Sequence, residues 1–302
     1  MLVLGGCRFI GYDAARTLAE RGYRVSVLDD RRCPGPVEGL EVHRAGPASV
    51  GLLDYVRGVD VVVNAYEFEG VNEARMRTGD AYRANVELAY RIHEAVIGSS
   101  VEKVIHLSTA AVYGEAEHTP IPESHRTLPV NWYGASRLAG ETIIYSLYTE
   151  RRVPVVVLRV FNVYGPGEWL RNNPGVVYEF ITAALGGGYI RLEGGGGQVR
   201  DFVHVIDVVR AVEESMDLAP GVYNVGSGKG VSIRDLADLI VRIHGEPVEV
   251  VIANPRPGDV LRSIADIAKI TGASRWRPLV PLEYGLEKLY QLYREKLSTA
   301  AR

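Results

Sequence analysis

Three residues of this sequence have the types and the spacing expected of a proton-transfer site. Thr109 supplies a hydroxyl just after the short apolar run 104–107. Tyr133 and Arg137 are four residues apart in a segment with helical periodicity, so they share one face of a helix. A positive charge beside a phenol favours the phenolate, which can accept a proton near neutral pH. The pattern predicts Tyr133 as a base assisted by Thr109 and Arg137, although a surface Tyr–Arg pair on an amphipathic helix would look the same.

A glycine-rich turn near the start of the chain predicts a second element of the site. The apolar run 2–4 enters the turn 5–11, a helix follows to about residue 21, and a strand over 23–28 ends at Asp29 and Asp30. Strand, turn, helix and strand with a terminal acid about 20 residues on is typical of dinucleotide binding. The helix N-terminus offers free N–H groups to a diphosphate, and Asp29 would accept hydrogen bonds from ribose hydroxyls.

The rest of the chain predicts an α/β fold with a doubly wound parallel sheet, that is, a Rossmann fold. Strand-like runs at 59–64, 104–107 and 154–158 alternate with helical stretches at about 72–97 and from 133 onward. After residue 166 the segments become shorter and richer in glycine. We therefore expect a dinucleotide-binding domain over 1–165, with returns near 202–228, and a smaller C-terminal substrate-binding lobe over 166–302. We also expect a final helix over 282–296 with a frayed tail after it.

Composition excludes several classes of function. The chain has 302 residues, 47% hydrophobic content and a formal net charge of −3, so no basic field indicates nucleic acid binding. No apolar run approaches the length that spans a bilayer. The seven histidines are scattered without ligand spacing, which predicts no metal site. The two cysteines, Cys7 and Cys33, are expected to be unpaired packing residues of a reduced, cytoplasmic protein.

Several further motifs extend the pattern towards the C-terminus. The sequence contains Phe161-Asn162 before a Val-Tyr-Gly-Pro segment, Arg200-Asp201-Phe202-Val203-His204-Val205, and Arg256-Pro257-Gly258-Asp259. With the glycine-rich turn, the threonine four residues before Tyr113 of a Val-Tyr-Gly segment, and Tyr133, this order resembles the extended short-chain dehydrogenase/reductases. More narrowly, it resembles their NAD-dependent epimerases and dehydratases that act on nucleotide sugars, including UDP-glucose/UDP-galactose 4-epimerases. The resemblance covers residues 5 to about 278.

The resemblance implies roles for individual residues. It implies that NAD is contacted by Gly5, Arg8, Phe9, Ile10, Gly11, Asp29, Asp30, Ala65, Tyr66, Asn85, Tyr133, Arg137 and Phe161. It implies that a nucleotide-sugar substrate is contacted by Thr109, Tyr133, Asn162, Arg200, Arg256 and Asp259. The two arginines also suit a diphosphate chemically, because a guanidinium binds phosphate oxygens in pairs.

The residues after Thr109 narrow the reaction that the resemblance implies. Dehydratase-like members carry an acidic pair there and decarboxylase-like members keep a glutamate, whereas this chain has Ala110 and Ala111. The pattern therefore resembles the 4-epimerases, in which a transient 4-keto sugar forms and is reduced on its other face. The implied assembly is a homodimer formed through the helices around Asn85 and after Tyr133, where Ala139, Ile143 and Tyr145 supply apolar surface.

The sequence departs from the family pattern at the cofactor. Arg137 replaces a lysine, and Arg for Lys at such a fixed site is not a conservative change. Arg8 replaces the middle glycine of the turn, so its side chain either swings away from the diphosphate or pairs with a phosphate. The stretch 44–48 lacks a usual aspartate, and Tyr66 is unusually bulky for its position.

These departures leave two alternatives to an active 4-epimerase. One is another sugar-nucleotide oxidoreductase of the same family. The other is a catalytically weakened module that binds NAD or a nucleotide sugar. Arg31 and Arg32 follow the acid and could hold a 2′-phosphate, but the negative charge of Asp29 favours NAD over NADP.

Overall fold

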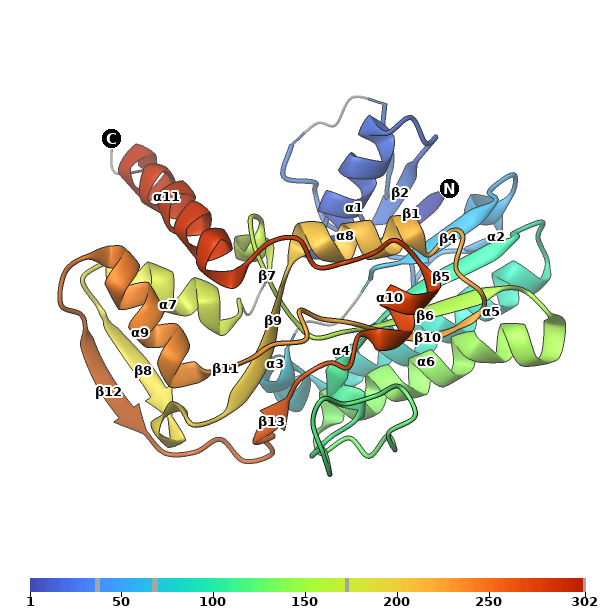
Figure 1. The fold of residues 1–302 in the computed structure, drawn as a ribbon. Coiled ribbons are helices and arrows are strands. Elements are labelled where there is room, and N and C mark those ends of the chain that lie inside the picture. The colour runs from blue at the N-terminus through green and yellow to red at the C-terminus, as the bar shows by residue number, and fades with distance from the viewer. Residues whose placement is uncertain (36–38, 67–69, 172–173, 301–302) are drawn as a thin grey trace.

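A computed structural model describes residues 1–302 apart from 36–38, 67–69, 172–173 and 301–302 (Figure 1). Its centre is a seven-stranded sheet in the order β10-β6-β5-β4-β1-β2-β3. Every strand pair in it is parallel. The strands are β1 (Leu2–Leu4), β2 (Ser26–Asp29), β3 (Glu41–Arg44), β4 (Val61–Asn64), β5 (Lys103–Thr109), β6 (Val155–Val160) and β10 (Gly221–Val225). The predicted doubly wound parallel sheet is confirmed, and its strand order reverses between β1 and β4, where ligands bind in such folds.

Helices cover both faces of this sheet. The helices α1 (Phe9–Glu20) and α8 (Val205–Glu214) pack together with one face, and the short α10 (Ala268–Ala273) lies beside β10. The helices α2 (Leu53–Val56), α5 (Leu88–Ile97) and α6 (Trp132–Arg151) pack with the other face. Successive strand residues alternate between the two cores, as the pleat requires.

The predicted helix over 72–97 is interrupted. It consists of α3 (Val71–Met76), α4 (Thr78–Tyr82), the π-helical segment η1 (Arg83–Glu87) and α5. Periodicity alone cannot detect the change from α to π geometry. Single π turns within α-helices are often found at functional sites, and this one carries Asn85.

Most residues after 160, apart from α8, β10 and α10, form a smaller lobe with its own core. One sheet of the lobe is mixed and contains, in order, β11 (Gly230–Ser232), β9 (Val199–His204) and β13 (Arg262–Ser263). A fourth strand, β7 (Asn162–Tyr164), also pairs with β9. The strands β8 (Tyr189–Glu193) and β12 (Glu249–Ala253) form a two-stranded sheet. The helices of the lobe are α7 (Val176–Leu185), α9 (Ile233–His244) and α11 (Leu282–Ala300). The final helix is longer than predicted, because α11 continues to Ala300 rather than ending at 296. Residues 301–302 of the expected frayed tail lie outside the described residues.

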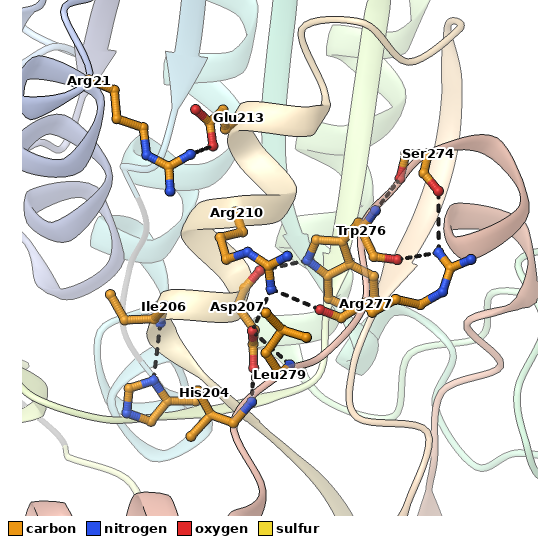
Figure 2. A network of polar contacts seen from close by, with 11 residues as sticks. Arg21, His204, Ile206, Asp207, Arg210, Glu213, Ser274, Trp276, Arg277 and Leu279 are labelled. Carbon is orange, nitrogen blue, oxygen red and sulfur yellow. Dashed lines mark hydrogen bonds and ion pairs between the residues drawn. The ribbon is translucent and has the colours of Figure 1, made fainter.

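Asp207 anchors the segment that leads into α11 (Figure 2). Its Oδ1 accepts a hydrogen bond from the Leu279 N–H and its Oδ2 accepts one from the Val280 N–H, both at 3.0 Å. The indole N–H of Trp276 donates to the Asp207 carbonyl oxygen at 2.8 Å. Since Asp207 and Trp276 are fully buried, this contact ties the C-terminal segment firmly to α8 beside the main sheet. In the parts of the chain that the structure describes, every helix is too short or too polar to cross a membrane.

The expectation about the cysteines is wrong. Cys7 and Cys33 form a disulfide with a Cα–Cα distance of 4.3 Å. They are 26 residues apart in the sequence, but β1 and β2 are parallel neighbours, so the turn after β1 lies beside the segment after β2. The bond links the glycine-rich turn to the segment that follows Asp29.

Candidate active site

The end of β5 positions Thr109, and the start of α6 positions Tyr133. Thr109 is the last residue of β5 and its Oγ1 accepts a hydrogen bond from the Ala111 N–H at 3.2 Å, which begins a 3-10 turn. Tyr133 lies in the first turn of α6, which Asn131 caps by accepting from the Gly134 N–H at 2.9 Å. An Asn at this position satisfies a backbone donor that the helix cannot pair, and so fixes where the helix begins.

Arg137 lies one turn along α6 from Tyr133 and is buried. Its Nη2 donates to the carbonyl oxygen of Leu107, and its Nη1 donates to Asn85 Oδ1 at 3.4 Å. Asn85 also donates through Nδ2 to Ser136 Oγ at 2.9 Å. The arginine is therefore held between the end of β5 and the π-helical segment.

His106 lies next to this cation and stays neutral. Burial, together with the positive charge of Arg137, lowers the pKa of His106 to about 3. One ring nitrogen, Nδ1, lies 2.9 Å from Asn64 Nδ2, and the ring is completely enclosed. Arg137 is therefore the charged group of this pair at any pH near neutrality.

A cavity of about 370 Å³ lies between the carboxyl edge of the main sheet and the small lobe. The predicted site residues that line it are Ile10, Ala65, Thr109, Tyr133, Arg137, Phe161, Asn162, Arg200, Arg256 and Asp259. The predicted residues outside its described lining are Gly5, Arg8, Phe9, Gly11, Asp29, Asp30, Tyr66 and Asn85. The cavity thus joins Thr109, Tyr133 and Arg137 to the small lobe but does not reach the acids at the end of β2.

The arginines of the small lobe line the far part of this cavity. Arg200 forms a close ion pair with Asp259 and donates through Nη1 to the Val199 carbonyl oxygen at 3.0 Å. Arg256 Nε lies 2.9 Å from Glu193 Oε2. The two arginines come from different segments and line the same cavity, an arrangement that suits an anionic ligand.

The glycine-rich turn has the close packing that nucleotide binding requires. Gly5 has a φ of +79°, and a Cβ on it would lie 2.6 Å from the Tyr66 Cα. A Cβ on Gly11 would lie 2.1 Å from the Gly5 carbonyl oxygen. Any side chain at either position would displace backbone, so both glycines are required for the turn to lie against the helix start.

Asp29 is enclosed behind the turn. Its Oδ2 accepts from the Cys7 N–H and its Oδ1 accepts from the Arg31 N–H, both at 3.0 Å. Burial raises the pKa of Asp29 to about 6 despite the opposing charge of Arg8. Arg31 donates through Nη1 to the Leu170 carbonyl oxygen at 2.9 Å, so its guanidinium points towards the small lobe.

The geometry can be compared with known proteins. Residues 1–226 match the model of the NAD dependent epimerase/dehydratase family. The chain belongs to this family.

Relatives and solved structures agree with that assignment. A putative UDP-glucose 4-epimerase of Methanocaldococcus jannaschii is 29% identical over 296 residues, which cover 96% of each chain. The structure of a UDP-glucose 4-epimerase from Thermotoga maritima with UDP-glucose has a TM-score of 0.92 and 31% identity, covering 98% of this chain and 99% of that one. The structure of MoeE5 in complex with UDP-glucuronic acid and NAD also has a TM-score of 0.92, with 28% identity and the same coverage.

This epimerase-family protein contains a buried network that the sequence analysis missed. Ser108 Oγ donates to Glu141 Oε2 at 2.8 Å, and Arg159 Nε donates to Glu141 Oε1 at 3.1 Å. Glu141 lies on α6 two turns beyond Tyr133, whereas Ser108 and Arg159 are paired neighbours on β5 and β6. The network fastens the face of α6 that carries Tyr133 and Arg137 to the sheet. The spacing of Tyr133, Arg137 and Glu141 on one helix face was a signal that could have identified it.

Glu168 is a second site residue that was missed. It lines the cavity and is fully buried, and its Oε1 accepts from the Gly175 N–H at 2.8 Å. Burial raises the pKa of Glu168 to about 7, although the charge of Arg171 opposes this. Its Oε2 has no hydrogen-bond partner among the residues that the structure describes. Nothing in the local sequence distinguishes this glutamate from an exposed one.

One group of potential metal ligands occurs within the described ranges. Ligand atoms of Glu117, His118 and His125 all lie within 4.8 Å of one another. Both ring nitrogens of His125 already make hydrogen bonds, one with the Glu117 N–H at 3.1 Å and one with the Arg126 carbonyl oxygen at 2.8 Å. The arrangement is therefore explained by the loop's own contacts.

Proposed function

We propose that this protein interconverts a UDP-hexose and its C4 epimer, with bound NAD and through a transient 4-keto sugar. The observation that carries the proposal is the meeting of Thr109, Tyr133 and Arg137 in one cavity with Arg200 and Arg256. Similar proteins are named UDP-glucose 4-epimerases, which supports the uridine nucleotide and the hexose.

The residues present fit NAD. The tight turn at Gly5 and Gly11, the free N-terminus of α1 and the acid at the end of β2 are the features that a dinucleotide needs. We assign the dinucleotide to residues 1–165 with the returning β10, and the substrate to the lobe from residue 166. When bound, NAD supplies the hydride acceptor for the first half of the reaction and the donor for the second.

Tyr133 takes the proton of the sugar 4-hydroxyl when C4 is oxidised, and returns it to the same oxygen when C4 is reduced on its opposite face. Arg137 favours the phenolate through its charge, and the Thr109 hydroxyl orients the sugar hydroxyl. Ala110 and Ala111 provide no further acid or base, so the ring loses only the hydrogens of C4 and its hydroxyl. Arg200 and Arg256 hold the diphosphate, and Asn162 and Asp259 complete the substrate contacts.

Arg137 also supports a second candidate, an NAD-binding module with weakened catalysis. Its guanidinium is committed to Leu107 and Asn85, where the family pattern has the smaller ammonium of lysine. A shift of about 1 Å at a catalytic group can cost about 100-fold in rate.

The test is conversion of UDP-galactose to UDP-glucose by the wild type and by Tyr133→Phe, Thr109→Val and Arg137→Lys. Tyr23→Phe, which removes the hydroxyl of an exposed tyrosine, is the control. The cofactor retained by the protein is identified after denaturation. We expect turnover without net release of NADH, at least 100-fold loss in Tyr133→Phe, and wild-type rates in Tyr23→Phe. NAD retention with turnover only in Arg137→Lys would favour the weakened module, and stoichiometric NADH release would favour a dehydrogenase.

We also propose a homodimer formed through η1, α5 and α6. Tyr82, at the end of α4 just before η1, is 49% exposed, and Tyr90 and Ile97 on α5 are 51% and 42% exposed. Ile143 and Tyr145 are half-buried on α6. Figure 1 shows α5 and α6 running side by side at the outside of the molecule. Sedimentation at micromolar concentration should give twice the mass of the chain, and the mass of one chain would refute the dimer.

A further inference from the structure

Arg8 lies against both acids at the end of β2. Its Nη2 is 2.7 Å from Asp30 Oδ1 and its Nε is 3.5 Å from Asp29 Oδ1. Its guanidinium carbon lies 3.9 Å from the centre of the Tyr66 ring, and Tyr66 donates its hydroxyl to Asp30 Oδ2 at 3.3 Å. Arg8 is only 7% exposed, so it is packed into the turn rather than extended into solvent. Two positions were predicted for this side chain, one beside a phosphate and one turned away from it. In the structure Arg8 is turned towards the carboxylates of Asp29 and Asp30.

These contacts occupy Asp29. The carboxylate already accepts from the N–H groups of Cys7 and Arg31, and it faces the Arg8 guanidinium as well. The two backbone donors are fixed by the turn and, for Cys7, by the disulfide to Cys33. A ribose hydroxyl that approaches Asp29 therefore meets the Arg8 guanidinium, which can move away, whereas the two backbone donors cannot.

Asp30 and Tyr66 stabilise this position of Arg8. An ion pair with one carboxylate and stacking on an aromatic face both favour a guanidinium over bulk water. The cavity agrees with the contacts, because among the described residues its lining includes Ile10 and Ala65 but not Arg8, Asp29 or Asp30.

We propose that Arg8 is an internal competitor for the adenosine half of the cofactor and that it sets how tightly NAD is held. The inference rests on the proposed function, because it concerns the dinucleotide of that site. Binding of the adenosine ribose at Asp29 requires Arg8 to leave both acids, and the loss of those contacts makes the free energy of binding less favourable. Ligands that lack adenosine bind without displacing Arg8, so their affinity is not reduced in this way.

Two substitutions of opposite charge separate this idea from simple electrostatics. Arg8→Ala removes the competitor, and Asp30→Asn removes the acid that holds it. If Arg8 occupies the ribose site, both variants bind ADP-ribose more tightly, by roughly 10-fold to 100-fold for the loss of a charged hydrogen bond. If Arg8 instead holds the diphosphate, Arg8→Ala binds more weakly and only Asp30→Asn binds more tightly.

Binding of ADP-ribose, NAD and nicotinamide mononucleotide should be measured by calorimetry for the wild type and both variants. The controls are Arg57→Ala and Asp54→Asn, which make the same charge changes in an exposed pair. We expect tighter binding of the two adenosine-containing ligands, unchanged binding of nicotinamide mononucleotide, and wild-type values in both controls. Because both explanations expect tighter binding from Asp30→Asn, Arg8→Met carries the test if Arg8→Ala does not fold: it removes the charge and keeps an unbranched side chain that can still pack on Tyr66.

Three results would overturn the inference. Weaker or unchanged ADP-ribose binding in a folded Arg8→Ala excludes competition by Arg8. An equal gain for nicotinamide mononucleotide places the effect elsewhere in the site. Failure of every variant to bind ADP-ribose shows that Arg8 is not what limits binding. Conversion of UDP-galactose by the wild type decides the proposed function separately from all three.

Discussion

Arg137 of α6 donates through Nη1 to Asn85 Oδ1 of the π-helical segment, over 3.4 Å. The contact joins the helix that carries Tyr133 to the only described residues with π-helical geometry. A π turn moves a side chain relative to a regular helix, and here it places the Asn85 side chain between Arg137 and Ser136. Asn85 is thus a positioning residue for the cation beside Tyr133.

Substitution of Asn85 by alanine should reduce kcat more than it changes KM. The variant removes the acceptor that holds one arm of Arg137, and leaves unchanged Arg200 and Arg256, the proposed contacts of the substrate diphosphate. We expect about a 10-fold to 100-fold lower kcat for UDP-galactose and a KM within about twofold of the wild type. The measurement is steady-state kinetics with thermal unfolding of the same samples. An unchanged kcat would show that Arg137 keeps its place without Asn85.

Gly140 permits the close approach of α6 to the same segment. A Cβ on Gly140 would lie 2.2 Å from the Asn85 carbonyl oxygen, which is backbone and cannot rotate away. We expect Gly140→Ala to lower the free energy of unfolding by about 1–3 kcal/mol through overpacking and to lower activity as well. Gly272→Ala is the matched control, because Gly272 also lies in a helix and its Cβ would meet nothing within 4 Å. Chemical denaturation should leave that control as stable as the wild type or slightly more so, and equal behaviour of the two variants would contradict the packing argument.

The sequence predicts those features that depend on local pattern. Period-2 and period-3.6 runs and the turn-to-acid spacing are enough to predict the parallel sheet and to bring Thr109, Tyr133 and Arg137 to one edge of it. Pairings between distant segments are not predictable in this way. The Glu141–Arg159 pair depends on how α6 crosses β5 and β6, and a helical pattern does not specify that crossing.

The same limit explains why the sequence did not predict the disulfide or the burial of Glu168. Cys7 and Cys33 meet because β1 and β2 are neighbours, and composition alone favours free thiols in a chain with few cysteines. Glu168 is buried beside segments that are distant in the sequence, since the Gly175 N–H donates to it and Tyr293 of α11 is close enough that the charge of Glu168 adds to burial in raising the pKa of Tyr293. In both cases the chemistry of the residue depends on a contact across more than one element.

Removal of the disulfide should destabilise the turn that carries Cys7. Closing a loop of this length in the unfolded chain is worth about 3 kcal/mol in the chain-entropy description. We expect Cys33→Ser to lower Tm, because the unfolded chain is no longer constrained. We expect reduction of the wild type by a dithiol to lower Tm by about as many degrees as Cys33→Ser does. Differential scanning calorimetry with and without reductant checks this. The variant should not respond to the reductant, and a wild type with an unchanged Tm after verified reduction would contradict the prediction.

Glu168 should make stability depend on pH in a defined window. Burial raises the pKa of Glu168 from 4.5 to about 7, so between these values the folded protein keeps a proton that the unfolded chain has lost. The folded state then binds more protons, and stability falls as the pH rises from about 4.5 to about 7 and levels off above that.

Replacement of Glu168 by glutamine removes this titration. We expect the variant to gain stability relative to the wild type as the pH rises through that window, by a few kcal/mol at most. Asp13→Asn is the comparison, because burial raises the pKa of Asp13 only from 3.8 to about 6. The stability that this variant gains relative to the wild type should therefore stop increasing at about pH 6. Urea unfolding at half-unit steps from pH 4 to pH 8 gives both curves. A Glu168→Gln curve that stays parallel to the wild type across pH 4.5 to 7 would show that the buried carboxyl is already ionised at acid pH.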